Sequence, residues 1–140
     1  MAYLEGIPVP APVIDTKAFW EYAKQQELRI QRCNRCWTFR FPPSPLCYKC
    51  HSLDFEWVRS RGEGRVYSYI IVHHPPHSAL REQVPFNVAV VELDDCGQIR
   101  VTSNIVDCPE EEVRVGMPVE LVWEEVTPEI NLYRFRTRKV

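Results

Sequence analysis

The sequence predicts a mainly β protein that begins with one short helix and a cysteine-rich ribbon. Three observations support this class. One segment near residue 20 has helical spacing of its apolar residues, four cysteines fall into two close pairs, and five segments after residue 56 have the composition of strands. The chain has 140 residues, 45% of them hydrophobic and 26% charged, which is typical of a soluble globular protein. We expect two domains, 1–56 and 57–140.

The segment before the cysteines predicts one short amphipathic helix. Asp15 and Thr16 offer side-chain oxygens for its N-cap, ahead of residues 17–24, and the pattern allows extension to Leu28. Three residues share one face of this helix: Phe19, Trp20 and Ala23. We expect this aromatic face to pack into the core rather than to line a ligand pocket.

The spacing of four cysteines predicts a metal site. The four are Cys33, Cys36, Cys47 and Cys50, in two C-x2-C pairs separated by ten residues. Two residues between cysteines let one tight turn present both sulfurs to the same ion, and two such turns complete the tetrahedral shell of Zn²⁺. Three prolines between the pairs exclude a helix there and stiffen the connection. We predict one structural zinc ion in a short ribbon; iron, a redox dithiol and a ribbon without metal are the alternatives.

Residues 47–51 also form a C-x-x-C-H pattern, which is typical of covalent haem attachment. That chemistry requires export, and residues 1–6 have neither the basic start nor the apolar stretch of a signal peptide. Haem would also leave the first cysteine pair unexplained. The N-terminal sequence, together with the lack of an apolar run of about 20 residues, predicts a cytoplasmic protein with reduced cysteines.

Five strands are predicted after the ribbon. They cover residues 57–72, 86–93, 99–106, 119–126 and 132–136. Gly62 and Gly64 mark a bulge or sharp coil in the long first strand. Residues 94–98 form a hairpin loop, and residues 109–112 a helical turn with Asp107 as candidate cap. Five strands with a kinked first strand, and a helical element between the third and fourth, indicate an OB-fold barrel.

Charge is distributed unevenly, although the net charge is only −2. Residues 29–49 carry five basic residues and no acidic one, whereas residues 61–140 carry 9 basic and 13 acidic residues, a net of −4. The basic residues can neutralise the formal charge of zinc with four thiolates, a role that competes with phosphate binding. Arg134, Arg136 and Arg138 surround Phe135, a pattern that on an OB barrel would suit single-stranded nucleic acid. Overall acidity argues against that function.

The remaining reactive side chains show no catalytic constellation. Cys96 and Cys108 have no activating neighbour in the sequence, so we expect small apolar core residues. Three histidines, His73, His74 and His77, occupy a proline-rich loop; an exposed loop is the simplest interpretation, and contact with a partner or ligand is the alternative. The sequence contains no Walker loop, dinucleotide-binding glycine fingerprint or triad spacing.

The order of these elements resembles a known family. The resemblance extends from about residue 15 to about residue 137, and it rests on the four cysteines, Phe41-Pro42-Pro43 and the segments 64–69, 73–77, 84–86, 88–93, 103–106 and 115–119. It is to the acyl-CoA-associated OB-fold proteins with a rubredoxin-like zinc ribbon, the domain of unknown function 35 family. The resemblance implies that the four cysteines bind zinc. That family often has glycine after each cysteine pair, where this chain has Trp37 and His51.

The resemblance also implies a function. Members look like non-catalytic partners of thiolase-type enzymes, or of hydratases, that act on CoA thioesters. We therefore expect an accessory subunit of a thiolase-like complex that helps to form the acyl-CoA site, with the catalytic groups on the partner. The candidate contact residues for CoA or the partner are Arg40, Phe41, His73, His74 and His77. A zinc-ribbon and OB module for single-stranded nucleic acid is the alternative, and a free-standing enzyme has no support among the residues.

Overall fold

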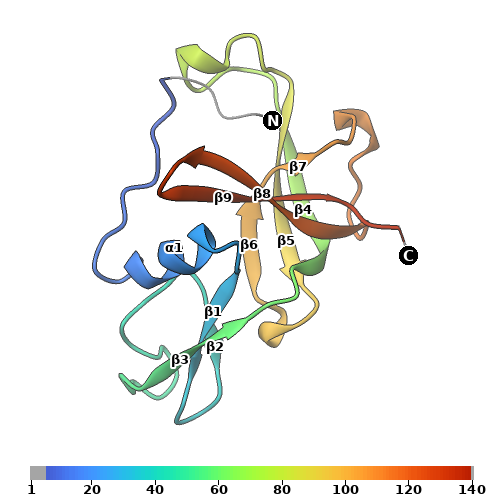
Figure 1. Ribbon diagram of the computed structural model, residues 1–140. Helices are drawn as coiled ribbons and strands as arrows, with labels where there is room; N and C mark the ends of the chain where they lie inside the picture. The colour runs from blue at the N-terminus through green and yellow to red at the C-terminus, as the bar shows by residue number, and fades with distance from the viewer. Residues whose placement is uncertain (1–5, 140) are drawn as a thin grey trace.

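The computed structural model describes residues 6–139 and confirms the predicted class (Figure 1). Within those residues, the helix α1 (Lys17–Lys24) precedes a three-stranded sheet and a six-stranded sheet. Three short 3-10 helices connect the strands: η1 (Ser78–Leu80), η2 (Cys96–Gln98) and η3 (Glu110–Glu112). The strands of the larger sheet follow the order and connections of an OB-fold barrel.

Thr16 is the N-cap of α1, as predicted, but its hydroxyl accepts a hydrogen bond from Val13 N (3.0 Å) and not from a helix amide. The helix ends at Lys24 and does not reach Leu28. The side chain of Asn131 binds the C-terminal end of the helix. Its Nδ2 donates hydrogen bonds to the carbonyl oxygens of Ala23 (3.1 Å) and Lys24 (3.2 Å). Gln26 N also donates to the carbonyl oxygen of Ala23 (2.9 Å), so the backbone and a barrel side chain together satisfy the end of the helix.

The ribbon is an antiparallel sheet in the order β2-β1-β3, formed by β1 (Arg29–Cys33), β2 (Phe39–Arg40) and β3 (Phe55–Arg59). The single strand predicted over residues 57–72 is therefore wrong. Its first part is β3, which pairs with β1, and its second part is β4 (Glu63–Val72), which begins the barrel. Between them the backbone turns at Gly62, whose φ is +75°; a Cβ there would lie 2.5 Å from Leu121 Cβ.

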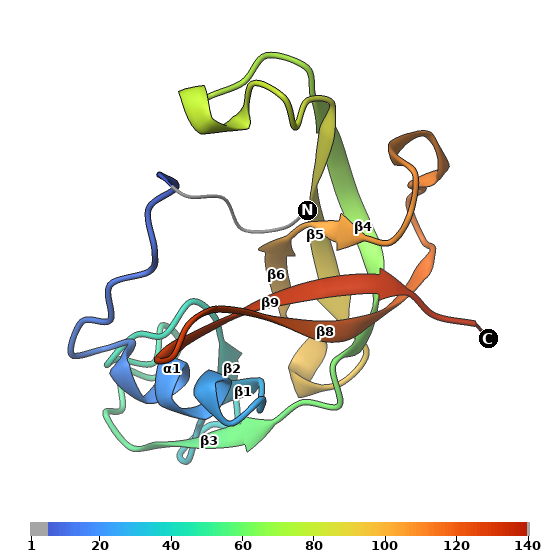
Figure 2. The same cartoon turned by 45° about the horizontal axis from the view of Figure 1, so that its top comes forward.

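The barrel sheet has the order β6-β5-β4-β8-β9-β7, as Figure 2 shows from a second angle. Its other strands are β5 (Phe86–Leu93), β6 (Arg100–Ser103), β7 (Ile105–Val106), β8 (Pro118–Thr127) and β9 (Ile130–Thr137). The predicted strand 99–106 is divided at Asn104: β6 runs antiparallel to β5, and β7 runs parallel to β9. β6 and β7 are the first and last strands in the order of the sheet. Because they are consecutive in the chain, the break at Asn104 brings the two edges of the sheet together into a barrel. A bulge lies at Tyr67, where the register shifts between Val66 and Ser68.

One core joins the helix, the ribbon and the barrel. The barrel contributes a set of fully or almost fully buried side chains: Val66, Ala89, Val91, Leu93, Val101, Val113, Val119 and Phe135. The Phe19 ring extends this core, with its centroid 5.8 Å from that of Phe41 in the ribbon and 6.0 Å from that of Tyr133 on β9. Edge-to-face contacts of this kind add to the apolar burial. Phe19 and Ala23 confirm the predicted core role of the helix face, whereas Trp20 is only partly buried and also lines a groove described below.

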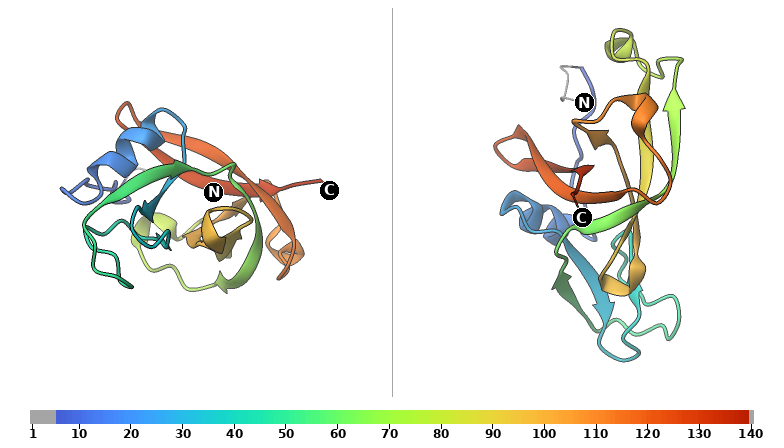
Figure 3. Two further views of the ribbon diagram at one scale, coloured as in Figure 1. Left: turned by 90° about the horizontal axis from the view of Figure 1, so that it is seen from below. Right: turned by 90° about the vertical axis from the view of Figure 1, so that its right-hand side faces the viewer.

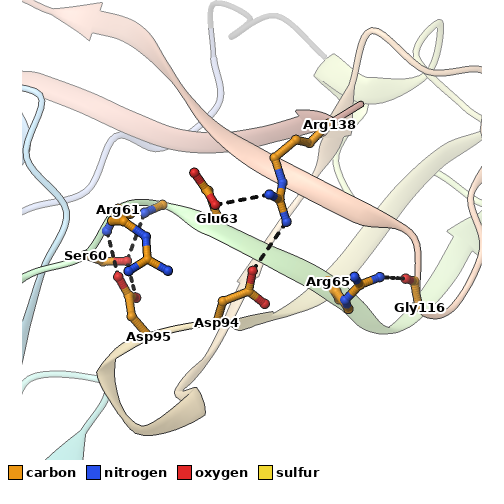
Figure 4. Close-up of polar contacts among 9 residues, drawn as sticks. Ser60, Arg61, Glu63, Arg65, Asp94, Asp95, Gly116 and Arg138 are labelled. Atoms are coloured by element: carbon orange, nitrogen blue, oxygen red, sulfur yellow. Dashed lines mark hydrogen bonds and ion pairs between the residues drawn. The ribbon is translucent and has the colours of Figure 1, made fainter. Parts of the chain in front are cut away.

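The linker between the two sheets is fixed by a side chain from the β5–β6 loop (Figure 4). Asp95 accepts hydrogen bonds from Ser60 Oγ (2.7 Å) and from Arg61 N (2.8 Å). Next to it, Arg138 contacts carboxylates of Glu63 (3.1 Å) and Asp94 (3.3 Å). The hairpin loop thus holds both the linker and the C-terminal segment.

Candidate metal centre and ligand surfaces

The ribbon brings its four cysteines together in one cluster. Their Sγ atoms all lie within 4.8 Å of one another. Cys33 and Cys50 Sγ are 3.5 Å apart, and Cys36 and Cys47 Sγ are 3.6 Å apart. A zinc tetrahedron with Zn–S bonds of ~2.3 Å has edges of about 3.8 Å, so four sulfurs with this spacing fit one zinc ion. The prediction of a structural zinc site at these cysteines is confirmed.

Two matching turns present the sulfurs. Trp37 N donates to Cys33 O (3.0 Å), and His51 N donates to Cys47 O (2.9 Å), so each turn closes over its cysteine pair. Trp37 and His51 have φ values of 64° and 63°, in the left-handed region that glycine adopts most easily. The sequence departs from glycine at these two positions, yet both turns keep the same geometry.

Hydrogen bonds prepare two of the thiols for metal binding. The backbone N–H of Cys36 lowers the pKa of Cys33, and the Thr38 side chain, 3.2 Å from Cys36 Sγ, lowers the pKa of Cys36 to about 6. At Cys50 the backbone N–H of Ser52 acts in the same direction, but burial and the neighbouring cysteines outweigh it and raise the pKa to about 11. Because zinc binds thiolates, the first pair is prepared for the metal more than Cys50 is.

The basic residues around the ribbon are largely occupied within the chain. Arg29 forms an ion pair with Glu27 (2.8 Å), and Arg32 forms one with Glu56 while its guanidinium lies 4.5 Å from the Trp37 ring centroid. The carboxylates that pair with them lie outside the stretch 29–49, which was acid-free in the sequence. These contacts reduce the positive charge that is available to an anionic ligand.

Arg40, one of the predicted contact residues, is buried, and Phe41, another of them, is partly buried. Arg40 is 5% exposed, and its Nε and Nη2 donate to Ser44 O at 3.0 and 2.7 Å. Gln31 supports the same loop, because its Oε1 accepts from Ser44 N (2.8 Å). Phe41 packs on Phe19 in the shared core. Both residues therefore shape the loop between the cysteine pairs, and a contact with CoA or a partner stays a prediction.

The histidine loop lies far from the ribbon. Figures 1 and 3 place the β4–β5 loop with η1 at one end of the molecule and the ribbon sheet at the other. His73 and His74 are exposed, while His77 Nδ1 accepts from Ala79 N (3.1 Å) and caps η1. The loop and the ribbon therefore do not form one continuous surface, although each remains a candidate for contact with a partner.

Acidic neighbours accompany the C-terminal arginines. Arg134 lies 3.7 Å from Glu124, Arg136 lies 3.7 Å from Glu120, and Arg138 contacts the two carboxylates described above. A strip that binds single-stranded nucleic acid needs cations directed toward phosphates. The pairing of these cations with strand carboxylates does not favour that use.

The two cysteines outside the ribbon have raised pKa values. Burial, followed by the charge of Asp95, raises the pKa of Cys96 to about 12. Burial and the carboxylates of η3 also raise the pKa of Cys108. A nucleophilic cysteine needs a lowered pKa, so both environments oppose thiolate formation at neutral pH.

One hollow lies where the sequence patterns predicted no site. This α1 groove, of about 520 Å³, is lined by Pro12, Val13, Ile14, Lys17, Trp20, Glu21, Lys24, Thr127, Glu129 and Ile130. Apolar residues form much of it, with Lys17 and Lys24 contributed by the helix. The sequence contains one sign of this groove, the apolar run Pro12-Val13-Ile14 before a helix with two lysines seven residues apart. Nothing in the sequence shows that the β8–β9 turn lies opposite this segment and completes the groove.

The chain matches two adjacent family models. Residues 20–56 match the rubredoxin-like zinc ribbon domain of ChsH2, and residues 57–124 match the C-terminal OB-fold domain of ChsH2. No helix among residues 6–139 is long and apolar enough to cross a membrane.

Two relatives and one solved structure show how far the similarity extends. A probable enoyl-CoA hydratase alpha subunit of Thermomonospora curvata is 46% identical over 91% of this chain, which spans 39% of that protein. A DUF35 domain-containing scaffold protein of Methanocaldococcus jannaschii is 37% identical, over 76% of this chain and 75% of the relative. The solved structure, an Ltp2-ChsH2(DUF35) aldolase, aligns with a TM-score of 0.82 at 44% identity, over 92% of this chain and 98% of the matched chain. The chain therefore belongs to the DUF35 family.

Proposed function

We propose that the protein is a non-catalytic accessory subunit of an enzyme complex that processes acyl-CoA thioesters. The single observation that carries the proposal is the similarity over 98% of the matched chain in the solved Ltp2-ChsH2(DUF35) aldolase. The names of the relatives, a hydratase alpha subunit and a scaffold protein, point to the same kind of role.

The chemistry of this chain supports a role without catalytic residues of its own. Cys96 and Cys108 have raised pKa values, which is the opposite of what a nucleophile requires. The four ribbon cysteines supply all four ligands of the zinc site, each through its Sγ atom. A structural zinc site of this kind leaves no open position for a substrate.

The proposal also concerns the class of enzyme to which the partner subunit belongs. The resemblance to the family implies a partner among thiolase-type enzymes or hydratases, and the similar proteins are named as a hydratase subunit and an aldolase. We propose a thiolase-like partner, and the experiment below compares it with the other two classes. The cytoplasm is the proposed location.

The α1 groove is the best place within this chain for part of an acyl-CoA ligand. Its apolar walls suit a hydrocarbon or pantetheine chain, and Lys17 and Lys24 can contact phosphates. We propose that the groove supplies one wall of the acyl-CoA site and that the partner supplies the reacting groups. Trp20→Ala would remove a large apolar wall and should weaken CoA-thioester binding by the complex several-fold.

Co-purification tests the proposal. The chain is co-expressed with one subunit of each class from the same genome, thiolase-like, hydratase and aldolase, and each mixture is passed over a sizing column with mass determination. We expect a stable complex with the thiolase-like subunit. A stable complex with only the hydratase or the aldolase would correct the partner class, and failure of all three to bind would contradict the proposed function.

A nucleic-acid assay tests the alternative function directly. With a net charge of −2 and paired C-terminal arginines, we expect weak binding to single-stranded DNA and RNA, decreasing as salt rises. Affinity tighter than about 1 µM at ~150 mM salt would favour the nucleic-acid module instead.

A further inference from the structure

Among the residues that the structure describes, no strand neighbours half of one edge of β4. β4 pairs with β5 along residues 64–72, but it pairs with β8 only at residues 63–65. Two more backbone hydrogen bonds extend that side by one residue: Gly116 N donates to Val66 O (2.7 Å), and Val66 N donates to Met117 O (3.1 Å). Beyond Val66, no backbone group among residues 6–139 bonds to β4 from that side. The right-hand view of Figure 3 shows this half of β4 at the margin of the molecule.

The free edge lacks the features that usually protect such strands. Residues 68–72 read Ser-Tyr-Ile-Ile-Val, which is strongly strand-forming and carries neither a charge nor a proline. Proteins normally protect an open edge with lysine, proline or a covering loop, because its N–H and C=O groups recruit another strand. The first proline after this edge is Pro75, beyond the end of β4.

The outer face beside this edge is apolar. Ile70 is 61% exposed and pairs with Val88 on β5; Tyr67, at the bulge, is 48% exposed. β5 alternates as expected for a barrel, with Ala89 and Val91 fully buried, but its outward positions include Val88 and Val90. Outward positions of an antiparallel sheet are usually polar. An apolar row next to an unpaired edge is therefore a surface built for contact.

The space beside the edge is acidic. A hollow of about 260 Å³ lies against β4 and is lined by Ile71, His73, Pro85, Glu110 and Glu111. Glu110 is held in place by Asn87 Nδ2 (2.6 Å), and Glu111 and Glu112 are exposed on η3. A segment that enters here would meet two or three carboxylates, so a basic side chain on that segment would be stabilised.

We infer that an extended, basic segment of the partner enzyme subunit adds to the free edge of β4 as an extra strand. Its backbone pairs with residues 68–72, its apolar side chains lie over Ile70 and Val88, and a lysine or arginine contacts Glu111. A second copy of this chain fits less well, because symmetric pairing would bring two acidic η3 turns to one interface. This inference rests on the proposed function, since it names where the partner binds.

Two measurements test the inference: the affinity of the complex and the rate of amide exchange in this chain. Both use the partner subunit that co-purification identifies. Ile70→Lys should weaken the complex at least ten-fold, because it places a charge on the apolar face. Ile70→Thr keeps the strand propensity and should weaken the complex several-fold. Glu111→Gln should weaken it a few-fold and reduce its salt dependence. Leu53→Lys, on a similarly exposed apolar residue of the ribbon (70%), compares the ribbon surface with the edge of β4, and it should change the affinity less than three-fold. Ile70 is exposed, so the melting temperature of each variant serves as the folding check.

Hydrogen–deuterium exchange separates strand addition from simple surface contact. Amides within residues 68–72 that face the open edge should exchange at least ten-fold more slowly in the complex than in the free chain. Unchanged exchange there, or full affinity in Ile70→Lys, would overturn the inference while leaving the proposed function intact. If the wild-type chain binds none of the three subunits, the proposed function itself fails and the inference fails with it. Protection that rises with the concentration of this chain alone would show that the occupant is a second copy, against our inference.

Discussion

Trp37 and His51 show how single residues depart from a pattern without changing the site. Each follows a cysteine pair at a backbone position with a left-handed φ, and each still donates its N–H to the first cysteine of its pair. A left-handed conformation costs a side-chain residue about 1–2 kcal/mol relative to the ordinary helix region. At Trp37, stacking with Arg32 offsets part of this cost. The sequence pattern predicted the four cysteine ligands. It could not show that both turns accept a residue with a side chain at the position after each cysteine pair.

The strain at His51 leads to a prediction. His51→Gly relieves the left-handed strain of about 1–2 kcal/mol but gives the unfolded chain about 0.4–1 kcal/mol of extra freedom. The free energy of unfolding should therefore rise by no more than about 1.6 kcal/mol. His51→Val, with a β-branched side chain at the same φ, should destabilise the protein by about 1–2 kcal/mol. Urea unfolding of the zinc-loaded protein measures both. Equal stability of the glycine and valine variants would contradict the argument.

The raised pKa values of Cys96 and Cys108 predict slow alkylation. Their thiols should react with iodoacetamide at pH 8 much more slowly than the same cysteines in the urea-unfolded chain, because a raised pKa leaves less thiolate. The burial of Cys96 also favours the folded state below the unfolded pKa of about 9, and this contribution is lost as pH rises towards about 12. Mass spectrometry of the labelled peptides gives the rates. Rapid labelling of folded Cys96 would show that its pKa is not raised.

At the scale of elements, the strand pattern predicted the barrel more securely than it predicted the partners of each strand. β5 lies at its predicted bounds, and the hairpin loop and the turn near residue 110 are present. The continuous strand-like pattern from Trp57 to Val72 hid a change of sheet, because β3 and β4 have the same composition and only the turn at Gly62 separates them. Likewise Asn104 divides one predicted strand into β6 and β7. Pairing between distant segments decides both breaks, and a local pattern does not contain it.

The ribbon should depend on its metal. We expect one zinc per chain by elemental analysis, and Cys33→Ser should lower zinc content and increase amide exchange in β1 and β3, since metal binding and local folding are coupled. Cys108→Ser, outside the cluster, is the matched control and should keep both properties. A Cys33→Ser protein with full zinc and an unchanged melting temperature would mean that Cys33 is not a ligand. A Soret band after expression with haem maturation factors would instead support the C-x-x-C-H interpretation.

The loop between β5 and β6 should contribute to the stability of the folded protein through Asp95. Asp95→Ala leaves Ser60 Oγ and Arg61 N without their acceptor and should destabilise the protein by about 1–3 kcal/mol. The neighbouring Asp94→Ala removes only an exposed ion pair with Arg138 and should cost less than about 1 kcal/mol. Thermal unfolding compares the two variants. If they were equally stable, the linker would not depend on Asp95.

At the scale of the whole molecule, side-chain contacts join the helix to both the ribbon and the barrel. Phe19 contacts the ribbon through Phe41 and the barrel through Tyr133, and Asn131 of β9 holds the helix end. The sequence predicted the elements and the zinc ligands. It could not show that Arg40 is buried and that Phe41 packs against the core, and their contact with CoA or a partner stays a prediction. It also missed the α1 groove and the free edge of β4, because both arise where distant segments meet or fail to meet.

The division of labour between this chain and an enzyme subunit is the central claim, and turnover of CoA thioesters tests it most directly. Activity is measured for the chain alone, for the thiolase-like subunit alone and for the two together, with the Cys96→Ser/Cys108→Ser variant as a control. We expect no turnover by the chain alone, higher turnover by the complex than by the subunit alone, and activity within a few-fold of wild type for the control. Turnover by the chain alone that disappears in Cys96→Ser or Cys108→Ser would show that the protein is itself an enzyme.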